Sequence, residues 1–141
     1  AASMNGYASG NIAPPLRGVK SLLYARPPRA VLADPAKGFY RVARRGGRVV
    51  GQILVTREWS DWRCADFWWV QSVYVVPEHR RHGVFRRLFE HVRAEAKEAG
   101  GVCGLRLYVE KANRPAQATY SALGMAPVPF DLYEMEFLKT P

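Results

Sequence analysis

The stretch of chain from Gln71 to Phe85 constrains the fold more than any other. It reads as an apolar strand that passes through Pro77-Glu78-His79 and Arg80-Arg81-His82-Gly83 directly into an amphipathic helix. The first backbone N–H groups of a helix have no partners within it and lie at the positive end of the helix dipole. The pattern therefore predicts a strand that runs into a helix N-terminus suited to an anion such as phosphate.

The side chains of this turn agree with an anion site. Gly83 tolerates the φ values that a tight turn demands, and Arg80, Arg81 and His82 supply side-chain donors. An ordinary basic turn before an ordinary helix explains the same fragment equally well, because short glycine and arginine patterns also occur by chance. Both interpretations stay open on these residues alone.

Size and composition favour one compact domain. The 141 residues are 48% hydrophobic and 12% aromatic, which is enough to build a core. No apolar run has the length of a membrane span, and residues 1–10 lack the zones of a signal peptide, so we expect a soluble, cytoplasmic protein with no membrane partner. Cys64 and Cys103 form no metal-ligand cluster, so we expect two free thiols and no metal.

The net charge of +9 lies entirely in the first part of the chain. Residues 1–57 hold ten Lys and Arg against one acid, Asp34, whereas residues 58–141 hold eleven of each sign. This asymmetry favours an anionic partner. A solvated hairpin face explains Arg44, Arg45 and Arg48 at least as well, so charge alone does not name the partner.

The N-terminal region predicts little regular structure. Residues 1–15 are rich in Gly, Ser, Asn and Ala and are interpreted as a flexible lead, followed by a single domain over residues 16–141. Leu16–Tyr24 and Ala30–Ala33 are expected to form short helical turns. Pro27-Pro28 should interrupt them, because proline removes a backbone donor and restricts the residue before it.

The rest of the chain alternates strands and helices. Gly46-Gly47 predicts a tight hairpin turn, Gly51 a bulge, and Gly100-Gly101 and Gly124 the ends of two helices. Strands are predicted over Phe39–Arg44, Val49–Arg57, Phe67–Val76, Val102–Val109 and Val128–Leu138, and helices from Val84 to about Gly100 and from Asn113 to Leu123. The continuous apolar run of Phe67–Val76 places that strand at the centre, buried on both faces. This order predicts an α/β fold with a mixed, partly parallel sheet flanked by helices.

Two ordered motifs resemble the GNAT superfamily of N-acetyltransferases. Val73 to Gly83 resembles the acetyl-CoA motif R/Q-x-x-G-x-G/A between the central strand and its helix. Leu107-Tyr108-Val109, followed by Asn113, Ala116, Tyr120 and Leu123-Gly124-Met125, resembles the later strand and helix of that family. The resemblance covers roughly residues 39–138. It implies a GNAT-type fold, with N-terminal helices reduced because residues 1–38 leave little room for them.

The resemblance also implies roles for individual residues. The pantetheine arm of acetyl-CoA would pair with the strand at Val73 and Val75, the pyrophosphate would bind at residues 80–85, and Tyr120 would protonate the departing thiolate. Asn113 would bind the cofactor or hold the loop, with a helix cap as the equal alternative, and packing in the core is the alternative for Tyr120. The implied cofactor residues are Val73, Tyr74, Val75, Arg80, Arg81, His82, Gly83, Val84, Phe85 and Asn113.

The sequence departs from the family pattern at the end of the first motif and at the general base. Phe85 stands where the family has a small residue beside the cofactor. No single acid is marked as the base, so the candidates are Glu110, Glu58 and Asp61, with a water relay as the alternative. Trp59 and Trp62 are the candidates for an acceptor wall, whereas Trp68 and Trp69 are expected to pack in the core.

Three functional hypotheses follow. The first is an N-acetyltransferase that transfers an acetyl group from acetyl-CoA to a primary amine in a ternary complex, with anionic and aromatic acceptors both open. The second is a non-catalytic acyl-CoA-binding module, motivated by Phe85 and the unassigned base. The third and least favoured is a nucleic-acid-binding protein, since no interleaved basic and aromatic motif is present. A homodimer stays open.

Overall fold

The computed structural model describes residues 27–138 of the chain. The chain divides into two compact units, residues 1–108 and residues 109–141. The predicted flexible lead over residues 1–15 and the helical turn over Leu16–Tyr24 lie outside the described residues. The single domain expected over residues 16–141 stays a prediction.

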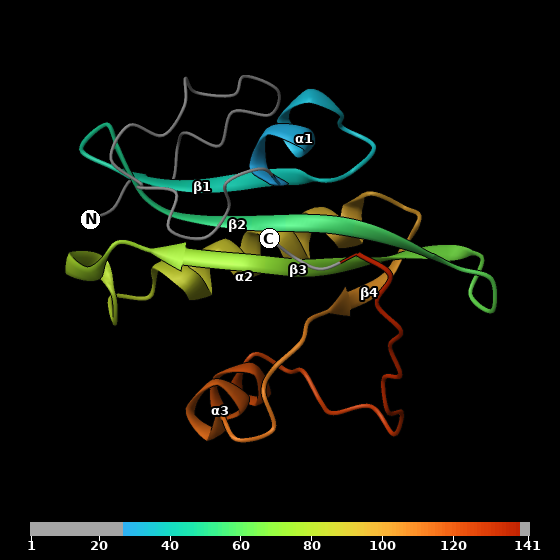
Figure 1. The fold of residues 1–141 in the computed structure, drawn as a ribbon. Helices are drawn as coiled ribbons and strands as arrows, with labels where there is room; N and C mark the ends of the chain where they lie inside the picture. The colour runs from blue at the N-terminus through green and yellow to red at the C-terminus, as the bar shows by residue number, and fades with distance from the viewer. Residues whose placement is uncertain (1–26, 139–141) are drawn as a thin grey trace. The chain divides into compact units, whose positions relative to one another are not determined.

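The first unit contains a mixed sheet of four strands (Figure 1). The strands are β1 (Phe39–Arg45), β2 (Arg48–Ser60), β3 (Ala65–Val75) and β4 (Val102–Arg106), and they lie in the order β1-β2-β3-β4. β1, β2 and β3 pair antiparallel, whereas β4 runs parallel to β3. The predicted α/β fold with a mixed, partly parallel sheet is confirmed, although β4 ends three residues before the predicted Val109.

Glycines at two positions explain local features of this sheet. Gly46 and Gly47 have φ values of 55° and 76°, and the hairpin turn predicted at this pair is confirmed. The register of β1 and β2 shifts between Ala43 and Arg44, directly beside Gly51, where a bulge was predicted. Gly51 also permits close packing, because a Cβ atom there would lie 2.8 Å from Val84 Cγ1 on the helix above.

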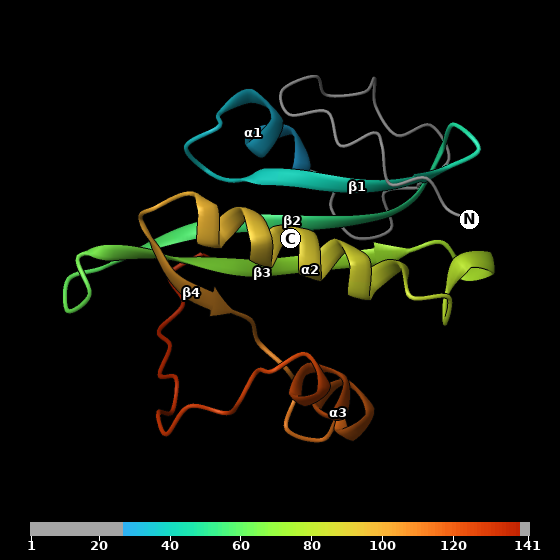
Figure 2. The ribbon, with the colours of Figure 1, turned by 180° about the vertical axis from the view of Figure 1, so that it is seen from behind.

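Helix α2 (Val84–Glu98) covers one face of the sheet (Figure 2). Its apolar side chains recur at helical spacing, and Leu88, Phe89, Val92 and Ala96 are buried. With Ile53 and Val55 of β2 they form the centre of the core. The predicted stop near Gly100 is confirmed, since the helix ends at Glu98 and Gly100 takes a left-handed φ of 71°.

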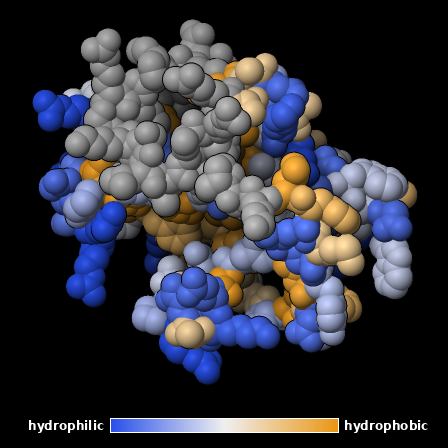
Figure 3. Space-filling view, viewed as in Figure 1, coloured by the Kyte–Doolittle hydropathy of each residue, from blue (hydrophilic) through white to orange (hydrophobic). Residues whose placement is uncertain are grey.

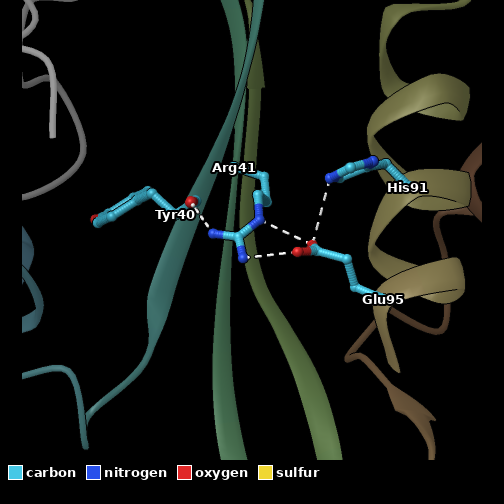
Figure 4. A network of polar contacts seen from close by, with 4 residues as sticks. All are labelled: Tyr40, Arg41, His91 and Glu95. Atoms are coloured by element: carbon cyan, nitrogen blue, oxygen red, sulfur yellow. Dashed lines mark hydrogen bonds and ion pairs between the residues drawn. The ribbon is translucent and has the colours of Figure 1, made fainter. Parts of the chain in front are cut away.

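An ion pair also joins α2 to the edge of the sheet (Figure 4). Arg41 on β1 donates from Nε and Nη2 to the two carboxylate oxygens of Glu95, each at 2.8 Å. The same guanidinium donates to the backbone carbonyl of Tyr40, and His91 Nε2 lies 3.5 Å from Glu95 Oε2. This two-pronged pair fixes the position of the helix against β1.

Two expectations about the N-terminal half need correction. Helix α1 spans Pro27–Ala33, so Pro27-Pro28 begins the helix rather than interrupting it. Proline is tolerated in the first turn because the N–H it lacks would have no helical partner there. Strand β3 has a neighbour on each side, as predicted, but within it only Phe67, Trp68 and Val70 are buried, whereas Val73 and Val75 are half-buried.

The second unit contains helix α3 (Arg114–Ala122) and the segment that follows it. The helix and its glycine terminator at Gly124, with φ of 90°, agree with the prediction. The strand predicted over Val128–Leu138 is wrong: no strand is assigned there. A strand needs a hydrogen-bonded neighbour, and Pro127 and Pro129 lack the donor that such pairing uses.

The segment after α3 instead leaves large apolar side chains exposed. The exposed residues are Val128, Phe130, Leu132, Tyr133, Met135, Phe137 and Leu138. The space-filling view shows hydrophobic atoms, in orange, at the surface among hydrophilic ones (Figure 3). Within residues 27–138, none of the helices has the length and apolarity that spanning a bilayer requires.

Candidate active site

The outer edge of β3 is open along its second half. Within the described residues, β4 pairs with β3 only from Asp66 to Trp69. The N–H of Val76 donates to the carbonyl of Val50 on β2, at 2.9 Å. Because backbone groups alternate in direction along an antiparallel pair, those of Val73 and Val75 point away from β2, toward the open edge. These are the two residues that the sequence analysis expected to pair with the pantetheine arm.

The turn after β3 holds two residues with left-handed backbone. Gly83 has a φ of 76°, which agrees with the role predicted for it, and Arg81 has a φ of 61°. A positive φ at a residue with a side chain costs roughly 1 kcal/mol or more, and residues with this conformation are often found at functional sites. The left-handed Arg81 was not predicted, since nothing in its residue type indicates this conformation.

The N-terminus of α2 carries backbone donors that precede the first hydrogen bond of the helix. The first helical bond here runs from the N–H of Arg87 to the carbonyl of Gly83, so the N–H groups of Val84, Phe85 and Arg86 precede it. Gly83 stands at the cap position, where no side chain makes a capping hydrogen bond. These donors lie at the positive end of a helix of 15 residues, an arrangement suited to a phosphate.

The basic side chains of the turn are held near the end of β3. Arg80 Nε donates to the carbonyl of Val75 at 2.9 Å, and its guanidinium lies 5.7 Å from the centre of the Tyr74 ring. His82 Nδ1 lies 2.7 Å from the carbonyl of Arg80. The structure therefore brings the predicted residues of the strand end and the turn together, while Arg81 is exposed beside them.

Phe85 directs its ring toward the core. The ring centre lies 6.0 Å from that of Phe89, whose side chain is almost completely buried. The large residue in place of the family's small one is thus accommodated by packing against Phe89.

A polar and aromatic cluster lies where β3 and β4 separate. Glu58 accepts from Trp69 Nε1 at 2.7 Å on one carboxylate oxygen and from Arg106 Nη1 at 2.8 Å on the other. The ring of Tyr108 lies 4.5 Å from that of Trp69, centre to centre. Sequence reasoning proposed Glu58 but missed Arg106 and Tyr108, because their proximity depends on the parallel register of β3 and β4.

The other acceptor candidates lie at the tip of the β2–β3 hairpin. Trp59 pairs with Asp66, which lies four residues before the open edge begins at Val70, so at 3.3 Å per residue about 13 Å separates Trp59 from that edge. Trp62 is almost fully exposed in the turn, where its N–H donates to Asp61 Oδ1. Of the acids in this hairpin, the structure brings only Glu58 to the point where the strands separate.

In the second unit, Asn113 caps helix α3. Its side-chain oxygen accepts from the N–H of Ala116 at 3.1 Å, which is the capping role that the sequence analysis held as the alternative to cofactor binding. Glu110, a candidate base, is exposed, and its backbone carbonyl accepts from the N–H of Asn113. Tyr120 is half-buried, and this burial raises the pKa of its phenol.

Comparison with known proteins decides the family. Residues 13–125 match the sequence model of the acetyltransferase (GNAT) family. The chain belongs to this family. The GNAT resemblance drawn from the two motifs is therefore confirmed, and the protein is an acyltransferase of the N-acetyltransferase type. GNAT acetyltransferases use acetyl-CoA as the acetyl donor.

Solved structures share this GNAT fold. A possible acetyltransferase from Clostridium difficile 630 is 44% identical, with a TM-score of 0.74 over 79% of this chain and 73% of that one. A ribosomal-protein-alanine N-acetyltransferase from Brucella melitensis biovar Abortus 2308 is 21% identical, with a TM-score of 0.65 over 77% of each chain. An aminoglycoside N-acetyltransferase in complex with CoA is 16% identical, with a TM-score of 0.64 over 78% of this chain and 83% of that one. The last two show the fold alone. No curated protein matched the sequence.

Proposed function

We propose that this GNAT enzyme transfers the acetyl group of acetyl-CoA to a primary amine by direct attack in a ternary complex. The observation that carries the proposal is the open edge of β3 at Val73 and Val75, which leads into the basic turn and the uncapped start of α2. An extended arm ending in phosphates has the same order of groups: amides that pair with a strand, then anions that bind helix N–H groups.

The groups present on the edge agree with this substrate. Because Arg80 already donates to the carbonyl of Val75, the groups left for the arm are the N–H of Val75 and both backbone groups of Val73. The pyrophosphate would take the N–H groups at the start of α2, with Arg81 and His82 adding positive charge. Pairing with a strand holds the thioester in one orientation, which lowers the entropic part of the barrier to attack.

The reaction itself needs an acid and a base. The amine nitrogen attacks the thioester carbonyl, an N–C bond forms, the C–S bond breaks, and the thiolate takes a proton. Tyr120 is proposed as the donor of that proton, because a phenol, whose ordinary pKa is about 10, is protonated at neutral pH. The proton of the amine passes to Glu58, Glu110 or a water molecule.

Calorimetric titration tests the cofactor site. Wild-type protein is expected to bind acetyl-CoA, and Arg81→Glu is expected to bind it about 10- to 100-fold more weakly, since a charge-assisted hydrogen bond is lost and a repulsive charge is added. Arg45→Glu makes the same charge change on the exposed β1–β2 hairpin and serves as the matched control. Equal loss of affinity in both variants would show that only the net charge matters.

The Tyr120→Phe variant tests the acid. It is expected to bind acetyl-CoA normally and to transfer the acetyl group at least about 100-fold more slowly, the usual contribution of general acid catalysis. Full activity would assign proton donation to another group. Absence of acetyl-CoA binding by the wild type would remove the proposal as a whole.

A further inference from the structure

We infer that Glu58, oriented by Arg106 and Trp69, binds the amino group of the acceptor in its ammonium form, which gives one proton to water before the neutral nitrogen attacks, and that this subsite selects amines carrying one positive charge. The inference rests on the proposed function, because it needs the acetyl group at the open edge of β3. It adds what that function leaves open, namely which residues receive the acceptor and what class of amine they admit.

The direction of the cofactor arm places the reacting group near this cluster. The turn that binds the phosphates follows the C-terminal end of β3, so an arm on the open edge runs from Val75 past Val73 toward Trp69. Trp69 is the last residue of β3 that pairs with β4, so the edge is covered by β4 between Asp66 and Trp69 and open after Trp69. The acetyl end of the arm therefore points at the place where Trp69 and Tyr108 meet.

Glu58 lies on the face of the sheet opposite α2. Position 51 faces α2, because a Cβ atom there would lie 2.8 Å from Val84 Cγ1, and side chains alternate along β2. Glu58 is an odd number of residues away from Gly51 and so points to the other face. Trp69 lies on that face too, because its cross-strand partner Thr56 is two residues before Glu58.

The carboxylate of Glu58 is ordered and still open to a ligand. Each of its oxygens accepts one hydrogen bond, and a carboxylate has about four acceptor positions. Its side chain is 44% exposed, so an ammonium can reach the remaining positions. Tyr108, which is 61% exposed, presents its ring beside that of Trp69, and the face of an aromatic ring attracts a cation.

Arg106 is a positioning residue in this arrangement. Its guanidinium lies 3.5 Å from the centre of the Phe67 ring, and Phe67 is buried, so the arginine is held between a fixed ring and Glu58. Arg63 lies 5.1 Å from the centre of the same ring. The guanidinium of Arg106, bonded to Glu58, leaves this cluster with no excess negative charge for a second ammonium, which disfavours polyamines and other polycationic acceptors.

Steady-state acetyl transfer to phenethylamine, butylamine and spermidine tests the inference. Phenethylamine and butylamine are expected to have a higher kcat/KM than spermidine. Glu58→Gln should raise KM for phenethylamine about 10- to 100-fold and leave KM for acetyl-CoA unchanged. Trp69→Phe keeps a ring but removes the donor to Glu58, and should raise the same KM about 3- to 10-fold. Glu90→Gln, on an exposed acid of α2, is the matched control.

Three outcomes would overturn the inference. These are a higher kcat/KM for spermidine, an unchanged phenethylamine KM in Glu58→Gln, and a loss in that variant confined to kcat, which would make Glu58 a base instead. Titration of phenethylamine into the CoA-bound protein gives a second readout, in which wild type binds and Glu58→Gln binds at least about 10-fold more weakly. If acetyl-CoA binds but no amine is acetylated, the proposed function fails, and this titration still decides whether Glu58 binds the ammonium.

Discussion

Replacing Glu95 by alanine is expected to destabilise the first unit by about 2 to 3 kcal/mol. The Arg41–Glu95 pair has two hydrogen bonds of 2.8 Å, and its side chains are only 21% and 27% exposed. An exposed ion pair contributes roughly 0.2–1 kcal/mol, whereas removing one partner of a buried pair costs roughly 3–5 kcal/mol. Because the Arg41–Glu95 pair is partly buried and has two charge-assisted hydrogen bonds, we expect the cost of removing Glu95 to lie between these two values.

The same helix offers a matched control. Glu90 pairs with Arg86 at 3.1 Å, and the side chains of Arg86 and Glu90 are 67% and 42% exposed. Glu90→Ala also removes a glutamate carboxylate from α2, five residues earlier, and is expected to cost about 0.5 kcal/mol or less. The difference between the two variants therefore isolates the contribution of burial and geometry at Glu95.

Urea unfolding followed by tryptophan fluorescence measures both free energies, and calorimetry measures the melting temperatures. For a chain of 141 residues, 2 to 3 kcal/mol corresponds to a decrease in Tm of roughly 8 °C. The effect of Glu95→Ala should persist in 0.5 M salt, because partly buried pairs are screened weakly. Equal destabilisation by the two substitutions, or a loss below about 1 kcal/mol for Glu95→Ala, would refute the reasoning.

Three further predictions concern packing, capping and pH. Gly51→Ala should lower the free energy of unfolding by about 1–3 kcal/mol and weaken acetyl-CoA binding, since the new Cβ would lie 2.8 Å from Val84 Cγ1. Gly101→Ala is the control, because a Cβ at that position meets no atom within 4 Å, and it should leave the free energy of unfolding nearly unchanged. Asn113→Ala should cost about 1 kcal/mol through the lost cap of α3, and a drop in acetyl-CoA affinity as well would show that Asn113 also binds the cofactor. Burial raises the pKa of Tyr120 in the folded state, so the free energy of unfolding should decrease as the pH rises above about 10, where the unfolded phenol ionises first. Urea unfolding at pH 9 and pH 11 should therefore show a smaller decrease for Tyr120→Phe than for the wild type.

The sequence predicts correctly those elements that depend only on residues close together in the chain. The Gly46-Gly47 turn, helix α2 and its stop at Gly100 follow from backbone freedom and apolar spacing, which are properties of neighbouring residues. The prediction of a strand over Val128–Leu138 was wrong because a strand also depends on residues far away in the chain. Alternating apolar residues permit a strand, but it forms only where a neighbouring strand pairs with it.

The sequence by itself determined that this chain is a GNAT acetyltransferase, because the strand, turn and helix of its first motif are adjacent in the chain and carry a residue pattern of their own. Only the tertiary structure brought together the residues proposed to bind the acceptor. Glu58 and Arg106 are 48 residues apart and meet through the register of β2, β3 and β4, as does the ring pair of Trp69 and Tyr108. Strand register is set by side-chain packing across the whole sheet, so no local pattern could have reported it.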